Sequence, residues 1–368
     1  MRRLTIILAL SLAAAAVTAQ SAFATGGWTA ASVPPLPGGV LLQGASALNN
    51  SDAWAVGFQV GDAAVAYHWN GTAWSLTPTP TLGENVGAPQ LEAVSASSPT
   101  DAWAVGAIDV APREKKTLIE HWNGSTWSVA QKNGVPGGGE LNGVVDLSLH
   151  DAWAVGPSGV VEHWNGTTWS VVTLPGPTFI PAALGNAISA VSANDIWILG
   201  HALNRSTGVF TSETLNFNGT SWTAVPLQQP NATNFGLNSL SAISATDIWA
   251  VGQVRPSSTA ANGSPLIEHY NGTAWSIVPS PTPGFDPTLT GVAGRSATDA
   301  YAVGTDFSND NGGPEQALIL RWNGTAWSKD SDGTIGGFPM AAATFPGANT
   351  EWAVGVSSSD QGLILSHP

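Results

Sequence analysis

Two recurring sets of residues are of the types that perform acid–base chemistry or bind metal ions. The first is the acid that begins a repeated hexapeptide, "DAWAVG" at Asp52, Asp101 and Asp151, with close variants at Asp195, Asp247 and Asp299; a seventh copy begins with Thr350. The second is a Glu-His pair, found at Glu120–His121, Glu162–His163 and Glu268–His269. Two carboxylates facing one another could hydrolyse a glycosidic bond, and imidazole with carboxylate could hold a divalent metal.

The spacing of both sets favours a structural role. Successive hexapeptides begin 44 to 52 residues apart, so equivalent acids belong to separate repeats and do not converge. Neighbouring residues of a strand point to opposite faces, so the Glu and the His of one pair cannot hold the same ion. We expect the acids to accept backbone N–H bonds in tight turns. We expect the Glu-His pairs to pack or form hydrogen bonds between repeats.

The elements that position these residues are predicted to be four β-strands per repeat. In the second repeat they are strand A (residues 91–97, "LEAVSAS"), strand B (102–106, "AWAVG"), strand C (118–122, "LIEHW") and strand D (126–129, "TWSV"). Alternating polarity and enrichment in Trp, Val and Ile favour strands over helices.

An Asn-Gly dipeptide joins strand C to strand D in six repeats. This dipeptide predicts a type I′ turn, in which both central residues have positive φ. Each dipeptide is followed by Ser or Thr and so also matches the N-glycosylation sequon, but the turn explains the constant placement.

The repeat count predicts a ring that closes by exchanging one strand. Seven hexapeptides accompany six Asn-Gly hairpins, because the chain ends in a strand C ("GLILSHP"). Residues 26–34 ("GGWTAASVP") match strand D and can complete the last repeat. Closure removes both exposed sheet edges. All 17 Trp residues then fall in strands B, C or D. The sequence therefore predicts an all-β, seven-bladed β-propeller with four-stranded blades.

Two regions are predicted along the chain: a signal peptide, residues 1–24, and a single propeller domain, residues 25–368. Arg2 and Arg3, an apolar run and small residues at Ala22 and Ala24 indicate a leader cleaved after Ala24, with an uncleaved anchor as the alternative. Blades are expected near residues 40–79, 90–131, 140–174, 184–226, 237–279, 288–329, and 339–368 plus 26–34.

The pattern resembles the β-propeller repeats of secreted bacterial proteins and is distantly similar to kelch and Asp-box propellers. A single Gly follows strand B where kelch repeats have two, and "WNGTAW" keeps only the Gly and Trp of an Asp-box. The resemblance implies architecture and not activity. Without Cys, a galactose-oxidase-like copper site is excluded, and no signature supports a sialidase-like arginine triad.

Charge and composition limit the partners. The chain has 11 Lys and Arg against 25 Asp and Glu, a net charge of −14, which disfavours nucleic acid and anionic membrane surfaces. No apolar stretch after the leader is long enough to span a membrane. We expect a secreted, extracellular bacterial protein that is a monomer.

Ligand-binding residues are expected in the B–C and D–A connections, because these share one face and vary between repeats. The predicted binding residues are Arg113, Lys115, Lys116, Arg205, Arg255, Asp306, Asp310, Glu315 and Phe285. The basic residues would hold an acidic group, or form a solvated loop. Phe285, with Phe179 and Phe235, would stack on a sugar or cap the core.

A calcium site is a further candidate at Asp306, Asp310 and Glu315, because alternating oxygen ligands suit that ion. The segment lacks the Gly and the final Glu of a calcium-binding loop. No other cofactor and no catalytic residue is assigned.

The predicted function is non-enzymatic binding of a glycan or an extracellular protein through the variable face. The alternative is a carbohydrate-active enzyme, a glycoside hydrolase or polysaccharide lyase. It would need two carboxylates about 5–10 Å apart on that face, outside the repeated positions. The residues that could supply them are Asp286, Asp306, Asp310, Glu315, Asp109, Glu114, Glu84 and Glu140, with His201 as a possible lyase base.

Overall fold

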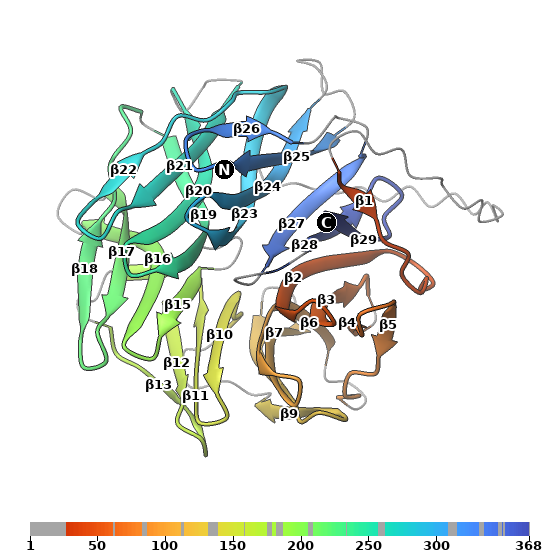
Figure 1. Ribbon diagram of the computed structural model, residues 1–368. Helices are drawn as coiled ribbons and strands as arrows, with labels where there is room; N and C mark the ends of the chain where they lie inside the picture. Colours follow the sequence, from red (N-terminus) through yellow and green to blue (C-terminus); the bar gives the residue numbers. More distant parts are fainter. Residues whose placement is uncertain are drawn as a thin grey trace.

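The described residues of the computed structural model form seven antiparallel sheets arranged in a ring (Figure 1). They are residues 27–61, 63–82, 87–111, 114–131, 139–157, 159–174, 179–181, 187–204, 209–232, 234–256, 262–307, 315–330, 335–344, 348 and 350–367. The predicted signal peptide lies outside them. No helix within these ranges is long and apolar enough to cross a membrane.

The first three blades follow one another with strands in the order A, B, C, D from the axis outwards. The first is β2 (Val40–Asn49), β3 (Asp52–Gln59), β4 (Ala64–Trp69) and β5 (Trp74–Thr77). The second is β6 (Ala88–Ser98), β7 (Asp101–Ala111), β8 (Glu114–Trp122) and β9 (Trp127–Gln131). The third is β10 (Gly143–Ser148), β11 (Asp151–Gly156), β12 (Val160–Trp164) and β13 (Trp169–Val171).

The next three blades repeat this order, with one addition. The fourth is β15 (Ile188–Ser192), β16 (Asp195–Asn204), β17 (Val209–Phe217) and β18 (Trp222–Pro226), and β14 (Phe179–Pro181) also pairs with β16. The fifth is β19 (Asn234–Ser244), β20 (Asp247–Arg255), β21 (Ser264–Tyr270) and β22 (Trp275–Ile277). The sixth is β23 (Phe285–Ser296), β24 (Asp299–Phe307), β25 (Glu315–Trp322) and β26 (Trp327–Lys329).

The last blade is completed by the N-terminal strand, as predicted. It contains β27 (Gly337–Ala343), β28 (Glu351–Ser357), β29 (Gly362–His367) and, on the outer edge, β1 (Thr29–Ala30). Thr29 pairs with Ser366 and Ala30 with Leu365. Trp28, 4% exposed, donates a hydrogen bond from Nε1 to Asp330 of the sixth blade at 2.8 Å. The exchange therefore closes the last blade and ties it to its neighbour.

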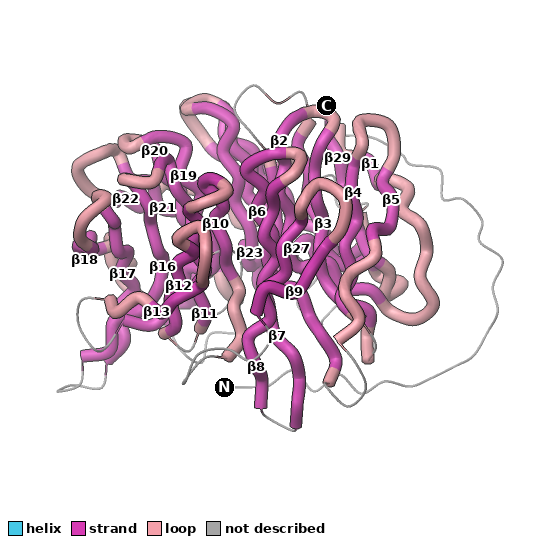
Figure 2. Tube along the Cα trace, turned by 90° about the horizontal axis from the view of Figure 1, so that it is seen from below, coloured by secondary structure: helices cyan, strands magenta, loops and turns pink. Residues whose placement is uncertain are grey.

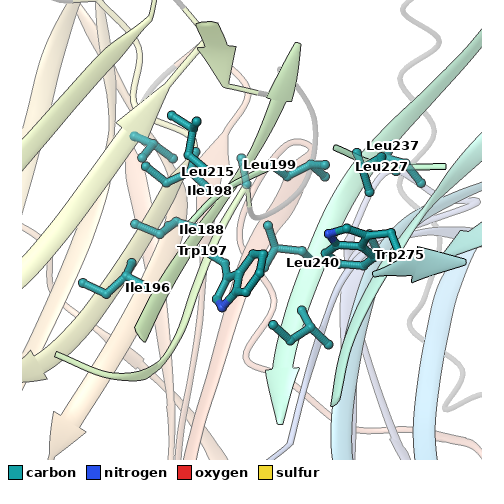
Figure 3. Packing of buried hydrophobic residues seen from close by; sticks show 14 of the residues in the cluster. Ile188, Ile196, Trp197, Ile198, Leu199, Leu215, Leu227, Leu237, Leu240 and Trp275 are labelled. Atoms are coloured by element: carbon teal, nitrogen blue, oxygen red, sulfur yellow. The ribbon is translucent and has the colours of Figure 1, made fainter. Parts of the chain in front are cut away.

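The core consists of aromatic contacts between blades. The strand-B Trp of one blade meets two aromatic rings of the next. Trp54 lies 5.0 Å from both Trp122 and Trp127, centroid to centroid. Figure 3 shows the equivalent contact of the fourth and fifth blades, where Trp197 and Trp275 face one another beside Leu240. Each strand-B aromatic therefore belongs to the interface between blades, which confirms the predicted role of the hexapeptide Trp.

The last Gly of the hexapeptide allows strand B to lie against a bulge in strand A. The register of β2 and β3 shifts between Leu42 and Gly44. A Cβ on Gly57 would stand 1.9 Å from the carbonyl oxygen of Leu41. The equivalent glycines of five further blades meet strand-A backbone in the same way. Any side chain there would collide with the neighbouring backbone, so Gly is required at this position.

Serines of the innermost strands join neighbouring blades near the axis. Ser46 Oγ accepts a hydrogen bond from the backbone N–H of Ala96 at 3.2 Å, and Ser95 Oγ accepts one from Asp146 at 2.9 Å. Ser189 and Ser241 form the same bond with the fifth and sixth blades, at 3.0 and 3.1 Å. These bonds hold the inner strands of adjacent blades at a constant spacing.

Candidate binding face and axial pocket

The repeated acids bind the histidines of strand C in the same blade. His68 Nε2 lies 2.8 Å from Asp52 Oδ1, and His121 Nε2 lies 2.7 Å from Asp101 Oδ1. The third and fifth blades repeat the pair at 2.8 Å. Each His also stacks on the strand-B Trp, with a centroid distance of 4.3 Å between Trp54 and His68. The acids were expected to accept backbone N–H bonds in their own turns, and that prediction is wrong in these blades: the turn N–H is accepted by the residue before the turn, as Ser98 Oγ accepts that of Thr100 at 3.3 Å.

The fourth and sixth blades have another residue in place of the histidine, and the last blade pairs a Glu with a His of strand C. Asn216 donates to Asp195 at 2.8 Å in the fourth blade, and Arg321 lies 3.3 Å from Asp299 in the sixth. In the last blade Glu351 pairs with His367 at 3.3 Å and with Arg295 of the preceding blade at 2.8 Å. Each repeated acid is thus bonded to a side chain of its own blade, and Glu351 also to one of the preceding blade. The acids do not converge on a common centre.

The glutamates of the Glu-His pairs are buried between blades. Glu120, Glu162 and Glu268 are all 0% exposed. Burial raises the pKa of Glu120 to about 8, so this carboxyl is largely neutral at pH 7. Burial raises the pKa of Glu268 to about 7, so the neutral and ionised forms of this carboxyl are about equal at pH 7. Glu162 accepts a hydrogen bond from Gln131 of the preceding blade at 2.8 Å. These glutamates therefore pack between repeats, as predicted. Each Glu points to the opposite face of the sheet from the His that follows it in the sequence.

The A–B turns and the C–D hairpins together form one face of the ring, called here the turn face. In each C–D hairpin the Asn Oδ1 accepts backbone N–H bonds from the second and third following residues, as Asn70 does at 3.0 Å from Thr72 and Ala73. Gly71 has a φ of 90° and its Cβ position lies 2.8 Å from Ser51 Cβ of the adjacent A–B turn.

The type I′ prediction for these hairpins is wrong. Among the described non-glycine residues, only Asp286 and Asp360 have positive φ. Trp69 pairs with Trp74, so four residues form the loop and the Asn carboxamide stabilises it.

The opposite ends of the strands form the loop face, which carries the B–C and D–A connections. In the first blade it contains Val60, Gly61 and residues 78–82. Figure 2, a side view of the ring, shows the end of the β7–β8 hairpin projecting beyond the other strands on this side. Several predicted loop residues are strand residues, because the strands extend past the bulge. Lys115 and Lys116 belong to β8, Arg255 to β20, Phe285 to β23, Asp306 to β24 and Glu315 to β25.

The six described candidates occupy separate parts of the ring. Lys115 and Lys116 lie in the second blade, Arg255 in the fifth, and Phe285, Asp306 and Glu315 in the sixth. Arg113, Arg205 and Asp310 lie outside the described residues, as does Glu84. Lys115 Nζ forms an ion pair with Glu140 at 3.0 Å, which joins the second blade to the third. The predicted basic cluster therefore includes an acidic partner.

Arg255 takes part in a polar network that joins the fifth and sixth blades. Its Nη2 lies 2.5 Å from Asp286 Oδ2. Asp286 Oδ1 accepts hydrogen bonds from Gln253 at 3.0 Å and from the Gly263 backbone at 2.9 Å. This network orders the strand ends around Asp286, whose φ of 53° is unusual for a non-glycine residue.

The calcium candidates are separated by the sheet. Asp306 is 1% exposed and its carboxylate lies 3.7 Å from Lys329 Nζ. Asp306 pairs with Gln316, whereas Glu315 pairs with Phe307, so the two acids point to opposite faces. No group of three His, Cys, Asp or Glu residues suited to a metal occurs within the described ranges. Calcium binding stays a prediction, since Asp310 lies outside those ranges.

A pocket on the ring axis contains polar residues that the sequence reasoning missed. It has a volume of about 40 Å³, and its polar lining comes from Gln43, Glu92, Asn142 and Ser239. Gly, Ala and Val residues of the innermost strands supply the rest of the wall. Gln43 and Glu92 stand at the bulges of β2 and β6. The signal for them was present, because each directly follows the apolar anchor of strand A, Leu42 or Leu91.

The residues at the strand-A bulge, the position of Gln43 and Glu92, have different contacts in different blades. In the fifth blade Asn238 donates to the Leu289 carbonyl at 2.7 Å, and in the sixth Thr290 donates to the Pro339 carbonyl at 2.8 Å. The side chains of Gln43 and Glu92 form no hydrogen bond with the residues that the structure describes. Glu92 is the one acid among the residues that line this pocket.

A wider chamber continues along the axis towards the turn face. Its volume is about 180 Å³, and the Ser residues that join the inner strands line it. The residues that line this chamber are Ala, Ser, Val, Ile, Leu and Thr, so none of them offers a charge to a ligand.

Solved structures share the architecture. The chain superimposes on YCF48 bound to D1 peptide with a TM-score of 0.59 at 14% identity, covering 94% of this chain and 98% of the other. YCF48 from Cyanidioschyzon merolae gives a TM-score of 0.59 at 15% identity, with coverages of 93% and 98%. The WD40 propeller domain of Doa1 gives 0.58 at 13% identity, with coverages of 93% and 97%.

These similarities show the fold alone, a seven-bladed β-propeller with four-stranded antiparallel blades. No protein-family model and no curated protein sequence matches the chain.

Proposed function

We propose that this protein is a non-enzymatic scaffold outside the cell that binds a protein partner through the loop face. The observation that carries the proposal is that polar groups are repeated and bonded to one another on one face of the ring, whereas the connections on the other face differ between blades. The repeated acids, histidines and asparagines are bonded to one another at the turn face. The loop face carries the connections that differ between blades, together with the strand-A bulges whose Gln43 and Glu92 line the axial pocket.

The location outside the cell rests on the sequence. Residues 1–24 have the pattern of a cleaved bacterial leader. The relation to kelch and Asp-box repeats stays a hypothesis from the sequence.

A peptide ligand is within the range of this architecture, because one similar propeller, YCF48, has been solved with D1 peptide bound. Carbohydrate binding has less support, because Phe235 and Phe285 are half-buried strand residues that pair with strand B. For a carbohydrate-active enzyme, two of the candidate carboxylates, Asp109 of the second blade and Glu140 at the third, are already bonded to neighbouring side chains. Lys115 holds Glu140, and Gln90 donates to Asp109 at 3.2 Å.

The test uses peptides selected from a displayed random library against the purified protein. Because the chain has no Cys, single cysteines can be introduced and labelled with a bulky maleimide. Val60→Cys and Glu114→Cys place the label on the loop face, and Leu149→Cys and Thr72→Cys place it on the turn face. All four positions are exposed, with Val60 at 50% and Leu149 at 58%.

Labels on the loop face are expected to abolish peptide binding, and labels on the turn face to leave it unchanged. Binding blocked only from the turn face would contradict the proposal. A glycan array and a polysaccharide-cleavage assay run in parallel; binding or cleavage there, with no peptide selected, would favour the carbohydrate alternatives.

A further inference from the structure

The axial pocket has the size and lining of a site for one small polar group. One water-sized group needs about 10–15 Å³ of such volume, so about 40 Å³ accommodates about three. An ammonium group with one or two waters fits this space, whereas an aromatic ring does not. The wall consists of small residues, including Gly44, Ala93 and Gly291, which leave the axis open between the inner strands.

Charge determines which group the pocket would accept. Glu92 contributes the charge, and Gln43 and Asn142 contribute amide groups. The charged groups that act on Glu92 are Glu140, Lys115 and Asp109. Lys115 and Asp109 lie at the loop-face ends of β8 and β7, and Glu140 lies in the connection before β10. Lys115 is already paired with Glu140, so it does not form an ion pair with Glu92. The whole chain has a net charge of −14. An anion would therefore be repelled, and a cation attracted.

The raised pKa of Glu92 agrees with a carboxylate that has no cation bound beside it. Burial raises its pKa to about 7, and the negative charges of Glu140 and Asp109 add to the shift while Lys115 opposes it. A cation seated beside the carboxylate would favour the ionised form and lower this pKa again.

We propose that the axial pocket receives the side-chain ammonium of a lysine that the partner protein inserts from the loop face, with Glu92 as its counter-charge. This inference rests on the proposed function, because it names the group through which the loop-face partner is recognised. Lysine has a compact charge at the end of a long flexible stem, which suits a small axial pocket lined by small residues.

The pH dependence follows from the two ionisable groups. Lysine stays protonated up to about pH 10. Glu92 changes from mainly neutral to mainly ionised as the pH rises through about 7. Binding of the ammonium is therefore expected to strengthen from pH 6 to pH 8.

The experiment compares two blocked tripeptides, acetyl-Gly-Lys-Gly-amide and its norleucine counterpart, together with n-butylammonium as the free probe. Binding is followed by the carbon-13 shift of the Glu92 carboxyl in the full propeller. The variant is Glu92→Gln, and Glu114→Gln is its control, an exposed acid of the same blade on the loop face. Thermal unfolding confirms that both variants fold.

The Lys peptide and butylammonium are expected to lower the Glu92 pKa, and the norleucine peptide to have no effect. Glu92→Gln should weaken Lys-peptide binding at least tenfold at pH 8, and Glu114→Gln by less than twofold. Equal binding of the Lys and norleucine peptides, or no loss in Glu92→Gln, would overturn the inference.

Failure of this inference can be told apart from failure of the proposed function. Library peptides that bind the loop face equally well in wild type and Glu92→Gln would refute the ammonium site and leave the scaffold intact. If butylammonium lowers the Glu92 pKa but no library peptide binds, the ammonium site is supported and the protein-binding function is refuted.

Discussion

The turn face and the loop face are built from the same strands but use their polar groups differently. At the turn face, His121 binds Asp101, Asn70 caps its own hairpin, and Gly71 lies against Ser51. At the loop face the contacts are particular to single blades, such as Arg255 with Asp286 and Lys115 with Glu140. Repetition therefore marks the residues that hold the ring together, and variation marks the face on which we expect a partner to be recognised.

The largest effect is expected from opening the ring. Deleting residues 27–34 exposes the edge of β29, and Trp28→Ala alone should lower the free energy of unfolding by about 3–5 kcal/mol. Trp28 packs 5.4 Å from Tyr301 and bonds Asp330, so its loss affects two blades. Urea unfolding measures the change, with Leu76→Ala, at a 41% exposed position, as the control. If the protein that lacks residues 27–34 were as stable as the full-length protein, closure of the ring by β1 would be contradicted.

The hexapeptide glycine provides the next test. Gly57→Ala would force a Cβ against the Leu41 carbonyl, and we expect a loss of about 3 kcal/mol from the resulting overpacking. Gly236→Ala is the matched control, because its Cβ would meet nothing within 4 Å and its φ is not positive. Thermal unfolding of both should show a large drop for the first and little change for the second. An equal loss of stability in the two variants would show that the strand-A bulge does not require Gly at position 57.

Removing a repeated acid should have a smaller effect. Asp101 is 0% exposed and holds both His121 and the Ser97 hydroxyl, the latter at 2.8 Å. Asp101→Ala leaves both partners unpaired, and we expect a loss of about 2–3 kcal/mol. Glu114→Ala, an exposed acid of the loop face, should change stability by less than about 0.5 kcal/mol. If chemical denaturation gives similar values for the two, the proposed division between faces fails.

The buried glutamates make stability depend on pH. Glu120 titrates near pH 8 in the folded protein but near 4.5 when unfolded, so stability present below pH 4.5 is lost as the pH rises towards 8. The loss cannot exceed about 1.4 kcal/mol per pH unit for this group. Glu120→Gln should therefore stabilise the protein at pH 8 more than at pH 5, as measured by melting temperature. A variant whose pH profile parallels that of the wild type would exclude this role for Glu120.

The smallest effect is expected on the loop face itself. The Lys115–Glu140 pair is 36% and 27% exposed, so Lys115→Ala should cost less than about 1 kcal/mol. A loss as large as that of Asp101→Ala, measured in the same denaturation series, would show that this ion pair belongs to the structural framework.

The sequence predicted the ring well, because the period, the strand order and the strand missing after Thr350 are properties of repetition. Trp28 could be placed in the last blade because its surroundings match those of Trp74. The Asp–His bonds were missed, since they join strands whose register appears only in three dimensions. Glu92 was missed because it occupies one of the equivalent strand-A positions of the repeats, and its role arises only where the inner strands of six blades enclose the axial pocket. Asp306 was misassigned to a loop because the strand continues past the hexapeptide.

Hydrogen–deuterium exchange with and without a selected peptide tests the division between faces most directly. Bound peptide is predicted to protect the loop-face ends of the strands and the β6 segment around Glu92, and to leave the Asn-Gly hairpins and A–B turns unchanged. Protection confined to those hairpins and turns, with no change near Glu92, would contradict the account.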